Sequence, residues 1–466
     1  MDIFNYILES INKQLSVYLL IPLLILAGIY FSCRTRFVQF RLFKDAFKTL
    51  LQKSEKGKVS SFQSLMISMA SRIGVGHIAG ITFAIVIGGP GAVFWMWLMA
   101  ILGSASAFIE STLAQIYKIR DEKGNFRGGP SYYIQKVLNK KWLGILFACL
   151  LTAGYAYGFN MLQSYQLSSS LEYYVPNYRH SVYPIIVGTI LATVVGLVIW
   201  GGTHRIAFVS KYIVPVMSIT YMLLAIVITI KNFDKVPGMV ALIFKEAFSI
   251  RSLLAVPFYR SALLNGIKKG LFSNEAGMGS APNAAATADV PHPVNQGLAQ
   301  VISVFIDTMM ICSATAFIVL LSGVKLNEGA SQVFIVQQAA KMQVGPFGAH
   351  VILFAVFSFA FASIIGNYCY AESNVLFIKN DKKVLNVFRA TCVLAVFLGA
   401  QAGANTVWNF SDIFMALMAT VNITVILLIG GIAIKAMNDY TSQRKSGKTP
   451  VFKAKNIGLD NTEVWK

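Results

Sequence analysis

Long apolar runs alternate with short polar segments along most of the chain. About eleven runs of roughly 18 residues or more are centred near residues 24, 75, 103, 155, 191, 220, 273, 309, 363, 394 and 424. Because about 20 helical residues cross a bilayer core, each run is long enough to span a membrane. Backbone polar groups need internal partners in lipid, and the alternating pattern of barrel strands does not occur. The pattern therefore predicts an all-α integral membrane protein with about eleven transmembrane helices.

Two of the predicted helices are interrupted by glycine and polar residues. The first break is at Gly74-Val75-Gly76-His77, and the second runs from Phe272 to Ser280. The ten spans after the first form two sets of five, over residues 62–230 and 260–437, and each set opens with a broken helix. An odd number of spans places the two halves in opposite orientations, which is the arrangement of an inverted repeat. Unwound N–H groups can hold a carboxylate and carbonyls a cation, so the pattern predicts a secondary transporter of small solutes.

Three segments lie outside the two predicted halves. Residues 1–61 hold one extra transmembrane helix and a basic amphipathic segment, and residues 231–259 form an extracellular connection. Residues 438–466 form a basic cytoplasmic tail, which we expect to be poorly ordered. The first apolar run has no basic residues before it of the kind that a signal peptide carries, so we interpret it as a retained span.

The charges indicate how the spans are oriented. Hydrophobic residues make up 56% of the chain and charged residues 13%, and the net charge is +20. With eleven spans, 28 of the 40 Lys and Arg residues fall on one side and nine on the other. The positive-inside rule then places the N-terminus outside and the C-terminus in the cytoplasm. We expect the membrane to be the plasma membrane, which in a bacterium is the inner membrane. Membrane insertion and contact with anionic lipid explain the basic charge, so no nucleic-acid partner is expected.

Other classes of protein fit the sequence poorly. The five cysteines form no C-x-x-C pair, and the five histidines are dispersed without H-E-x-x-H or G-x-S-x-G. We therefore expect neither an enzyme nor an organic cofactor. A channel is an open alternative, since its pore could be built from rings of residues of several subunits. We expect the chain to function as a monomer.

Specific motifs resemble the alanine or glycine:cation symporter family, a branch of the leucine-transporter-type fold. The segment Gly270–Pro282 fits the family's F-S-N-E-A-G-x-G-S-A-P motif, and Ile78-Ala79-Gly80 and Gly88–Ala92 match the first broken helix and its turn. Further matches are His292-Pro293, Gln296-Gly297, Asp307-Thr308, Cys312, Tyr370, Glu372, Asp412 and Met415–Ala419. The resemblance covers residues 15–437. It implies Na⁺-driven uptake of a small neutral amino acid by alternating access, in a 5+5 inverted repeat preceded by one helix.

The resemblance also implies two sets of site residues. In the first, the N–H groups of Val75 and Gly76 bind the substrate carboxylate, while Phe272 and Asn367 line the pocket. The full substrate set is Val75, Gly76, His77, Gln163, Phe272, Asn274, Ala276 and Asn367. The second set surrounds Na⁺ with backbone carbonyls and the Ser363 hydroxyl. Its members are Ala70, Ile73, Phe359, Ala362 and Ser363.

The sequence departs from the family pattern around this site. Val75 and His77 stand where the family has Thr and Asn, Asn367 replaces Trp, and Ala362 replaces one of two hydroxyl residues. A polar Asn367 predicts a substrate larger or more polar than alanine, for example glutamine. Histidine is a poor Na⁺ ligand, because hard cations prefer oxygen. His77 has three open roles: it bonds the substrate, it couples a proton, or it is a neutral residue bonded to a neighbouring helix.

Four carboxylates lie within or near the predicted spans. Such groups are costly in a membrane and are usually functional. They are Glu110, Glu275, Asp307 and Glu372. We expect Glu275 to cap the free N–H groups of the second broken helix, and Arg72 to pair with one of the four.

Overall fold

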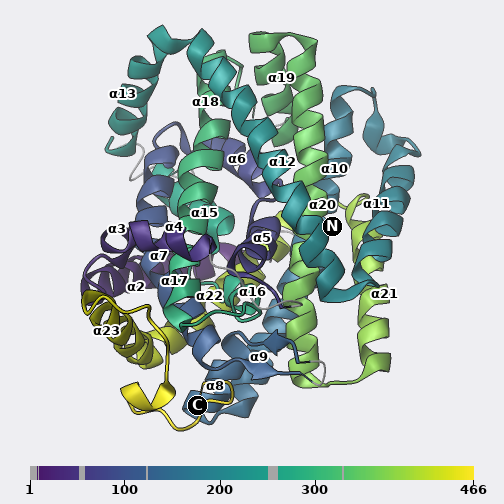
Figure 1. Cartoon of the computed structure of the whole chain (residues 1–466). Helices are drawn as coiled ribbons and strands as arrows, with labels where there is room; N and C mark the ends of the chain where they lie inside the picture. Colours follow the sequence, from purple (N-terminus) through teal and green to yellow (C-terminus); the bar gives the residue numbers. More distant parts are fainter. Residues whose placement is uncertain are drawn as a thin grey trace.

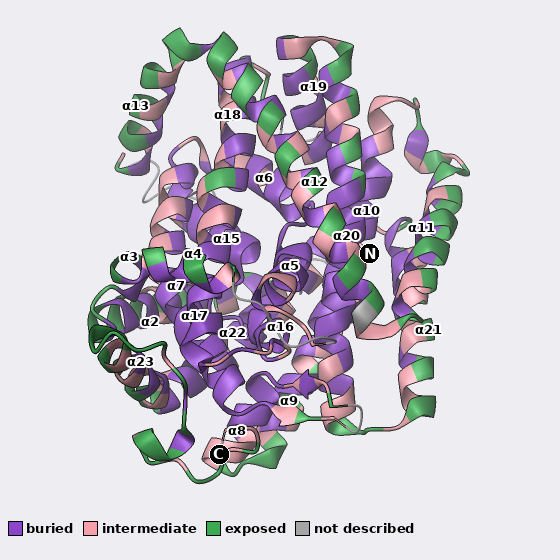
Figure 2. Cartoon of the chain, viewed as in Figure 1, coloured by how far each residue is buried: buried purple, intermediate pink, exposed green. Residues whose placement is uncertain are grey.

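The structure is a computed structural model that describes residues 8, 10–51, 58–121, 124–249, 261–327 and 330–465. It is built of helices arranged around a buried centre (Figure 1). The predicted start of the second half, residue 260, lies outside the described residues. Buried residues fill the middle of the molecule, while the outward faces of α11, α12 and α21 are exposed (Figure 2).

The first part of the chain forms the following elements, in which η marks π- or 3-10-helical turns. They are η1 (Leu15–Leu20), α2 (Ile21–Arg34), α3 (Val38–Arg41), α4 (Phe43–Leu50), α5 (Ser61–Arg72), η2 (Gly76–Gly80), α6 (Ile81–Gly88), α7 (Ala92–Ile116), β1 (Ile119–Arg120), β2 (Phe126–Arg127), α8 (Pro130–Leu138), α9 (Lys141–Leu151), η3 (Thr152–Phe159), α10 (Asn160–Ser169), η4 (Ser170–Tyr173), η5 (Tyr178–His180), α11 (Tyr183–Ile199) and α12 (Gly202–Lys231).

The second part begins with two elements on the connection between the predicted halves. Its elements are η6 (Phe233–Lys235), α13 (Val236–Ala247), α15 (Ala262–Asn274), α16 (Ala281–Ala285), α17 (Pro293–Phe305), η8 (Ile306–Cys312), α18 (Ser313–Ser322), α19 (Gln332–Val344), α20 (Pro346–Ile378), α21 (Lys382–Gly399), α22 (Ala404–Ile429), α23 (Gly431–Lys445) and η9 (Ala454–Ile457).

Seven helices in the described part of the chain are long and apolar enough to cross a membrane. An eighth candidate is the bent pair formed by Ser61–Arg72 and Gly76–Gly88, whose two parts meet at 54°. The helix α11 is apolar but has only 17 residues. The structure thus supports a multi-pass membrane protein, while the count of eleven spans stays a prediction.

Exposed apolar side chains cover the outside of several helices, as lipid contact requires. On α12 alone they include Phe208, Tyr212, Val216, Ile219, Leu223, Ile226, Val227 and Ile230. Soluble proteins rarely expose apolar areas this large, so this face of the protein is suited to contact with lipid rather than water.

The C-terminal tail differs from our expectation of disorder. The Phe452 ring packs on the His292 ring with centroids 5.1 Å apart, and the Phe452 N–H donates to the Pro291 carbonyl at 3.0 Å. The Trp465 indole donates to the Gln115 carbonyl at 2.8 Å. The tail is held because two of its aromatic residues, Phe452 and Trp465, contact the rest of the protein, which its mostly polar composition does not reveal. A second small difference is the two-residue hairpin β1–β2 beside it, which the all-α prediction did not include.

Both predicted breaks are present, and both lie in the buried centre. At the first, α5 begins with a capping box in which Ser60 Oγ accepts from the Gln63 N–H and Gln63 Oε1 accepts from the Ser60 N–H. The helix ends at Arg72, and η2 begins at Gly76. At the second, α15 ends at Asn274 and α16 begins at Ala281. The helix α5 packs against α12 and α20, and α15 packs against α7.

Candidate functional site

The first break is closed by a side chain from α10. Gln163 is buried, and its Oε1 accepts a hydrogen bond from the backbone N–H of Val75 at 2.8 Å. A Cβ on Gly74 would overlap the Gln163 amide, so a larger residue at this position would have to push the end of the Gln163 side chain aside. The structure therefore brings Gln163 to the amide that was predicted to bind a carboxylate.

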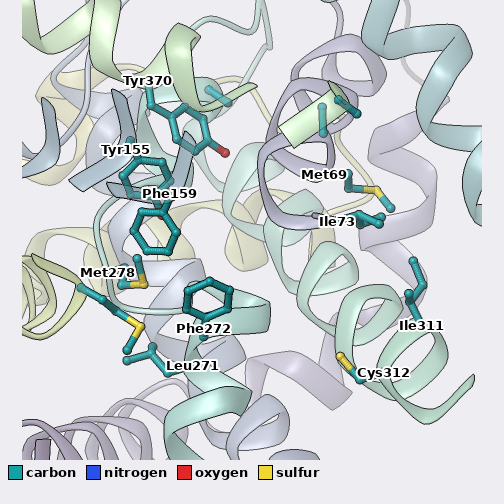
Figure 3. Packing of buried hydrophobic residues seen from close by; sticks show 14 of the residues in the cluster. Met69, Ile73, Tyr155, Phe159, Leu271, Phe272, Met278, Ile311, Cys312 and Tyr370 are labelled. Carbon is teal, nitrogen blue, oxygen red and sulfur yellow. The ribbon is translucent and has the colours of Figure 1, made fainter. Parts of the chain in front are cut away.

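Aromatic side chains cover the other side of this break. The Phe272 ring of α15 occupies the space in which a Cβ on Gly76 would lie. Its centroid is 5.1 Å from that of Phe159 and 5.3 Å from that of Trp408 (Figure 3 shows the Phe159 and Phe272 rings next to one another). Val75 is fully buried behind this wall. Phe272, which was predicted to line the substrate pocket, thus lies against Gly76 of the first break.

His77 connects η2 to two other elements. Its Nε2 lies 3.0 Å from Ser273 Oγ on α15, which in turn lies 2.8 Å from Cys312 Sγ on η8. The His77 carbonyl accepts from the Thr315 hydroxyl at 2.8 Å. Its Nδ1 is buried and has no hydrogen-bond partner among the described residues. One ring nitrogen of His77 is therefore hydrogen-bonded to Ser273, and the other has no hydrogen-bond partner among the described residues.

Asn367 belongs to a chain of buried polar groups that crosses from α20 to the first broken helix. Its Oδ1 accepts from the Ser71 hydroxyl at 2.5 Å, and its Nδ2 donates to Asn160 Oδ1 at 3.0 Å. The Ser363 hydroxyl donates to the Ser71 carbonyl at 2.8 Å. The Asn367 amide is thus hydrogen-bonded on its oxygen to α5 and on its nitrogen to α10.

The predicted sodium ligands lie on two elements that touch. Ala70 and Ile73 are at the end of α5, and Phe359, Ala362 and Ser363 are on α20. A Cβ on Gly366 would overlap the Ser71 backbone, which shows how closely α20 approaches α5. No group of three or more His, Cys, Asp or Glu side chains could hold a metal in the residues that the structure covers. A cation here would be held by backbone carbonyls and a hydroxyl, which are donors that suit Na⁺.

The second break is capped by a carboxylate from another helix. Glu110 of α7 accepts from the N–H groups of Gly277 at 3.2 Å and Gly279 at 3.0 Å, and from the Asn422 amide at 2.7 Å. Both glycines have positive φ, of +85° and +81°. The expectation that Glu275 caps these groups is wrong. Glu275 itself adopts a left-handed conformation, with φ of 52°, and its carboxylate turns to the Ser280 hydroxyl at 2.6 Å.

Two of the predicted substrate residues lie at the start of the second break, Asn274 at the end of α15 and Ala276 just after it. The Asn274 Oδ1 accepts from the Ala276 N–H at 3.1 Å. Ala276 packs against Ala100, Ala107 and Val304, which belong to α7 and α17. The structure therefore brings Val75, Gly76, His77, Gln163, Phe272 and Asn367 into one region and places Asn274 and Ala276 against α7 and α17.

Arg72 lies between two carboxylates. Its Nε is 3.9 Å from Glu275 Oε2, its Nη1 is 3.6 Å from Asp307 Oδ2, and its Nη1 donates to the Ser303 hydroxyl at 2.8 Å. All three charged side chains are buried. The expected pairing of Arg72 is thus present, and it ties the first broken helix to the second and to η8.

A second charge cluster was not predicted from the sequence. It lies next to the aromatic side chains Phe272 and Trp408. Lys268 and Lys269 of α15 lie 2.9 Å and 3.5 Å from Asp412 of α22. Lys269 Nζ also lies 3.9 Å from the centroid of the Trp408 ring, and Asn12 of the N-terminal helix accepts from Lys268 at 2.8 Å. Charged residues within apolar runs were a usable signal, because such residues rarely lie unpaired in a membrane.

A cavity of about 400 Å³ opens on the opposite side of the break, where the N-terminus of α5 lies. Lys58, Arg127, Asn283 and Glu372 are among the residues that line it. Glu372 pairs with Arg389 at 3.2 Å in its wall. Several charged side chains therefore line this cavity, which lies apart from the residues of the first break.

The fold is that of a multi-pass membrane protein with helices interrupted at two buried breaks. The fold is that of MhsT, solved in complex with L-phenylalanine, with a TM-score of 0.60, 85% of this chain and 93% of that chain covered, and 14% identity. The chain belongs to the sodium:alanine symporter family, whose model matches residues 1–454. Membership assigns it to amino-acid:cation symport.

Two curated relatives are similar over nearly the full length. The amino-acid carrier protein AlsT of Bacillus subtilis is 45% identical over 451 residues, which are 96% of this chain and 94% of AlsT. The "Probable sodium/glutamine symporter GlnT" of the same organism is 43% identical over 454 residues, which are 97% of this chain and 94% of GlnT.

Proposed function

We propose that the chain is a secondary active transporter that couples Na⁺ to the uptake of a small neutral amino acid by alternating access. The observation that supports this best is the convergence of α5, η2, α10, α15 and α20 on one unwound backbone segment at Val75 and Gly76. A helix break in the middle of a membrane protein offers N–H groups to an anion and carbonyls to a cation within a few ångströms.

The substrate carboxylate binds the N–H groups of Val75 and Gly76, and the substrate side chain lies toward Phe272 and Asn367. Asn367 has a donor and an acceptor, both engaged with Ser71 and Asn160. A polar side chain can exchange with these bonds, whereas an aliphatic one leaves the amide as it is. We therefore propose glutamine or a similarly polar neutral amino acid as the preferred substrate, in line with the likeness to GlnT.

The coupling Na⁺ binds between α5 and α20. The carbonyls of Ala70, Ile73 and Phe359 and the Ser363 hydroxyl supply its ligands, and Ala362 leaves one ligand fewer than a pair of hydroxyl residues would. Ser363 Oγ donates to the Ser71 carbonyl in this structure, so the cation takes the place of that hydrogen bond. Binding across the two helices stabilises one of the two conformations and so shifts their populations.

The two sides of the site differ in the way that alternating access requires. The Lys268, Lys269 and Asp412 cluster lies beyond Phe272 and Trp408 and closes the predicted extracellular side. The cavity lined by Glu372 lies on the predicted cytoplasmic side and forms the exit path. This assignment uses the predicted topology of eleven spans in a 5+5 inverted repeat, with residues 62–230 and 260–437 as halves, the N-terminus outside and the chain acting as a monomer.

Proton coupling through His77 is the second candidate. The Nδ1 of this buried side chain favours it, because Ser273 engages only Nε2 and leaves Nδ1 as the ring nitrogen that could take up a proton. A channel is the third candidate and is separated from a carrier by counterflow.

Uptake into proteoliposomes separates these candidates. Purified protein is tested with radiolabelled alanine, glycine and glutamine under imposed gradients of Na⁺, H⁺ or K⁺. We expect saturable accumulation under the Na⁺ gradient, glutamine as the strongest competitor, and counterflow with unlabelled substrate. Accumulation under the H⁺ gradient alone contradicts Na⁺ coupling, and preference for alanine or glycine contradicts the assignment of Asn367.

A further inference from the structure

The backbone amide of Val75 already has an acceptor within the protein. Gln163 Oε1 accepts its hydrogen at 2.8 Å, and the Gln163 side chain lies directly over Gly74. The neighbouring amides are bonded to the chain itself: the Ile73 N–H donates to Met69 O at 2.7 Å and the Gly74 N–H to Arg72 O at 2.7 Å. Val75 is therefore the residue of this turn whose N–H is satisfied by a side chain that can rotate.

A carboxylate that binds Val75 must displace this side chain. A single N–H at normal geometry holds one strong acceptor, and Gln163 fills the space on the Gly74 side. A carboxylate is a stronger acceptor than a neutral amide, because charge-assisted hydrogen bonds are shorter and about twice as strong. The exchange is thus favourable for a substrate carboxylate, while water and weak neutral acceptors gain little by it.

We propose that Gln163 is a latch that competes with the substrate: its amide oxygen occupies the carboxylate position at Val75, and substrate binding releases it. The latch keeps a buried N–H group satisfied when no carboxylate is bound, which avoids the cost of an unpaired buried donor. It also keeps α10 attached to the first broken helix until a carboxylate arrives. This rests on the proposed function, since it concerns the same carboxylate position.

The latch predicts an effect opposite to that of a direct substrate ligand. Gln163→Met keeps the length of the side chain and removes the acceptor, so the substrate no longer competes with an internal group. We expect the amino-acid Kd at saturating Na⁺ to fall about two- to ten-fold, which corresponds to one ordinary hydrogen bond. Gln163→Glu places a permanent carboxylate at Val75, and we expect it to raise Kd by about ten-fold or more.

The test is equilibrium binding of radiolabelled glutamine and alanine to purified full-length protein. Gln166→Met is the matched control, because Gln166 is a buried glutamine on the same helix and neither of its amide atoms has a hydrogen-bond partner among the described residues. We expect this variant to bind as the wild type does. Monodisperse elution and an unchanged unfolding midpoint establish that each variant is folded.

The outcomes are distinct. Tighter binding in Gln163→Met and weaker binding in Gln163→Glu support the latch. Weaker binding in Gln163→Met overturns it and makes Gln163 a direct ligand, and an unchanged Kd overturns it and makes Gln163 a packing residue. If the Met variant does not fold, the Glu variant decides, because wild-type affinity there contradicts the latch. If the wild type binds no amino acid in Na⁺, the proposed function fails, whatever the variants do.

Discussion

Each of the two broken helices has backbone N–H groups that need an acceptor, and the two breaks find different acceptors. At the second break, the N–H groups of Gly277 and Gly279 are held by the Glu110 carboxylate, which Asn422 holds in turn. At the first, the N–H of Val75 is held by a single neutral amide from Gln163. Strong charge-assisted bonds fix a backbone, whereas one neutral bond can be exchanged for another acceptor.

This difference assigns different tasks to the two breaks. The second break is capped from within the protein, so it serves as a rigid part of the frame. The first is capped weakly, next to His77, whose Nδ1 has no partner in the described part of the chain. The departures that the family resemblance indicates, Val75 and His77, lie at the exchangeable break, so we expect a change of substrate to be accommodated there without loss of the fold.

Removal of the Glu110 carboxylate is expected to have the largest effect. Glu110→Ala leaves the Gly277 and Gly279 N–H groups buried without an acceptor, and leaves the Asn422 amide only its 2.9 Å bond to the Gly277 carbonyl. We expect the free energy of unfolding to fall by about 3 kcal/mol or more, since each unpaired buried group costs about 1–3 kcal/mol. Thermal unfolding of the purified protein measures this. Glu110→Gln keeps one acceptor oxygen and should lose less. Wild-type stability in Glu110→Ala would contradict the claim that the Glu110 carboxylate makes the second break more rigid than the first.

A side chain at the first break is expected to affect transport rather than folding. The Cβ of Gly76→Ala overlaps the Phe272 ring and pushes it out of place. Overpacking costs about 1–3 kcal/mol, so we expect the uptake efficiency kcat/KM to fall about ten-fold or more. Gly238→Ala is the control, because a Cβ on Gly238 meets nothing within 4 Å. Full uptake by Gly76→Ala would place the site elsewhere.

A substitution of Asn367 tests whether the first break, and not the second, selects the substrate. Asn367→Trp restores the residue that the family resemblance predicts and removes the bonds to Ser71 and Asn160. We expect the ratio of glutamine to alanine uptake to fall about ten-fold, because a site that lacks a polar partner discriminates against a polar substrate. Competition assays in proteoliposomes measure the ratio. An unchanged ratio would mean that Asn367 does not contact the substrate side chain.

The smallest expected effect concerns His292, the N-cap residue of α17. Its Nδ1 accepts from the Val294 N–H at 3.2 Å, and its Nε2 lies 3.2 Å from Asp439. Burial lowers the pKa of His292 to about 4. The unfolded chain therefore binds the proton first, so stability is lost as the pH falls from about 6.5 toward 4 and is insensitive to His292 above that range.

The variant His292→Asn tests this assignment. Asparagine also accepts at a helix N-cap and does not titrate, so the decrease in unfolding midpoint between pH 7 and pH 5 should become smaller. Uptake at pH 7 should change little, since His292 lies away from the first break. An unchanged pH dependence would show that other groups cause the acid sensitivity.

Periodicity and glycine placement predicted both breaks and most of the helices, because a bilayer constrains length and apolarity so strongly. The partners of the breaks were less predictable. Glu110 was recognised as an intramembrane carboxylate, yet its contact with Gly277 joins residues far apart in sequence, and the nearer Glu275 was the natural but wrong choice. The family resemblance indicated that Asn367 stands in place of a Trp. The hydrogen bonds of Asn367 to Ser71 and Asn160 could not be predicted, because they depend on how α5, α10 and α20 pack together.

The central claim is that an amino acid and Na⁺ bind together at the first break. Equilibrium binding of radiolabelled glutamine to the purified protein, in Na⁺ and in an equal concentration of K⁺, tests it most directly, with Gly76→Ala measured alongside. We predict saturable binding in Na⁺, much weaker binding in K⁺, and loss of binding in Gly76→Ala protein that still elutes as a folded, monodisperse species. Equal binding in the two salts, or wild-type binding by a folded Gly76→Ala, would contradict it.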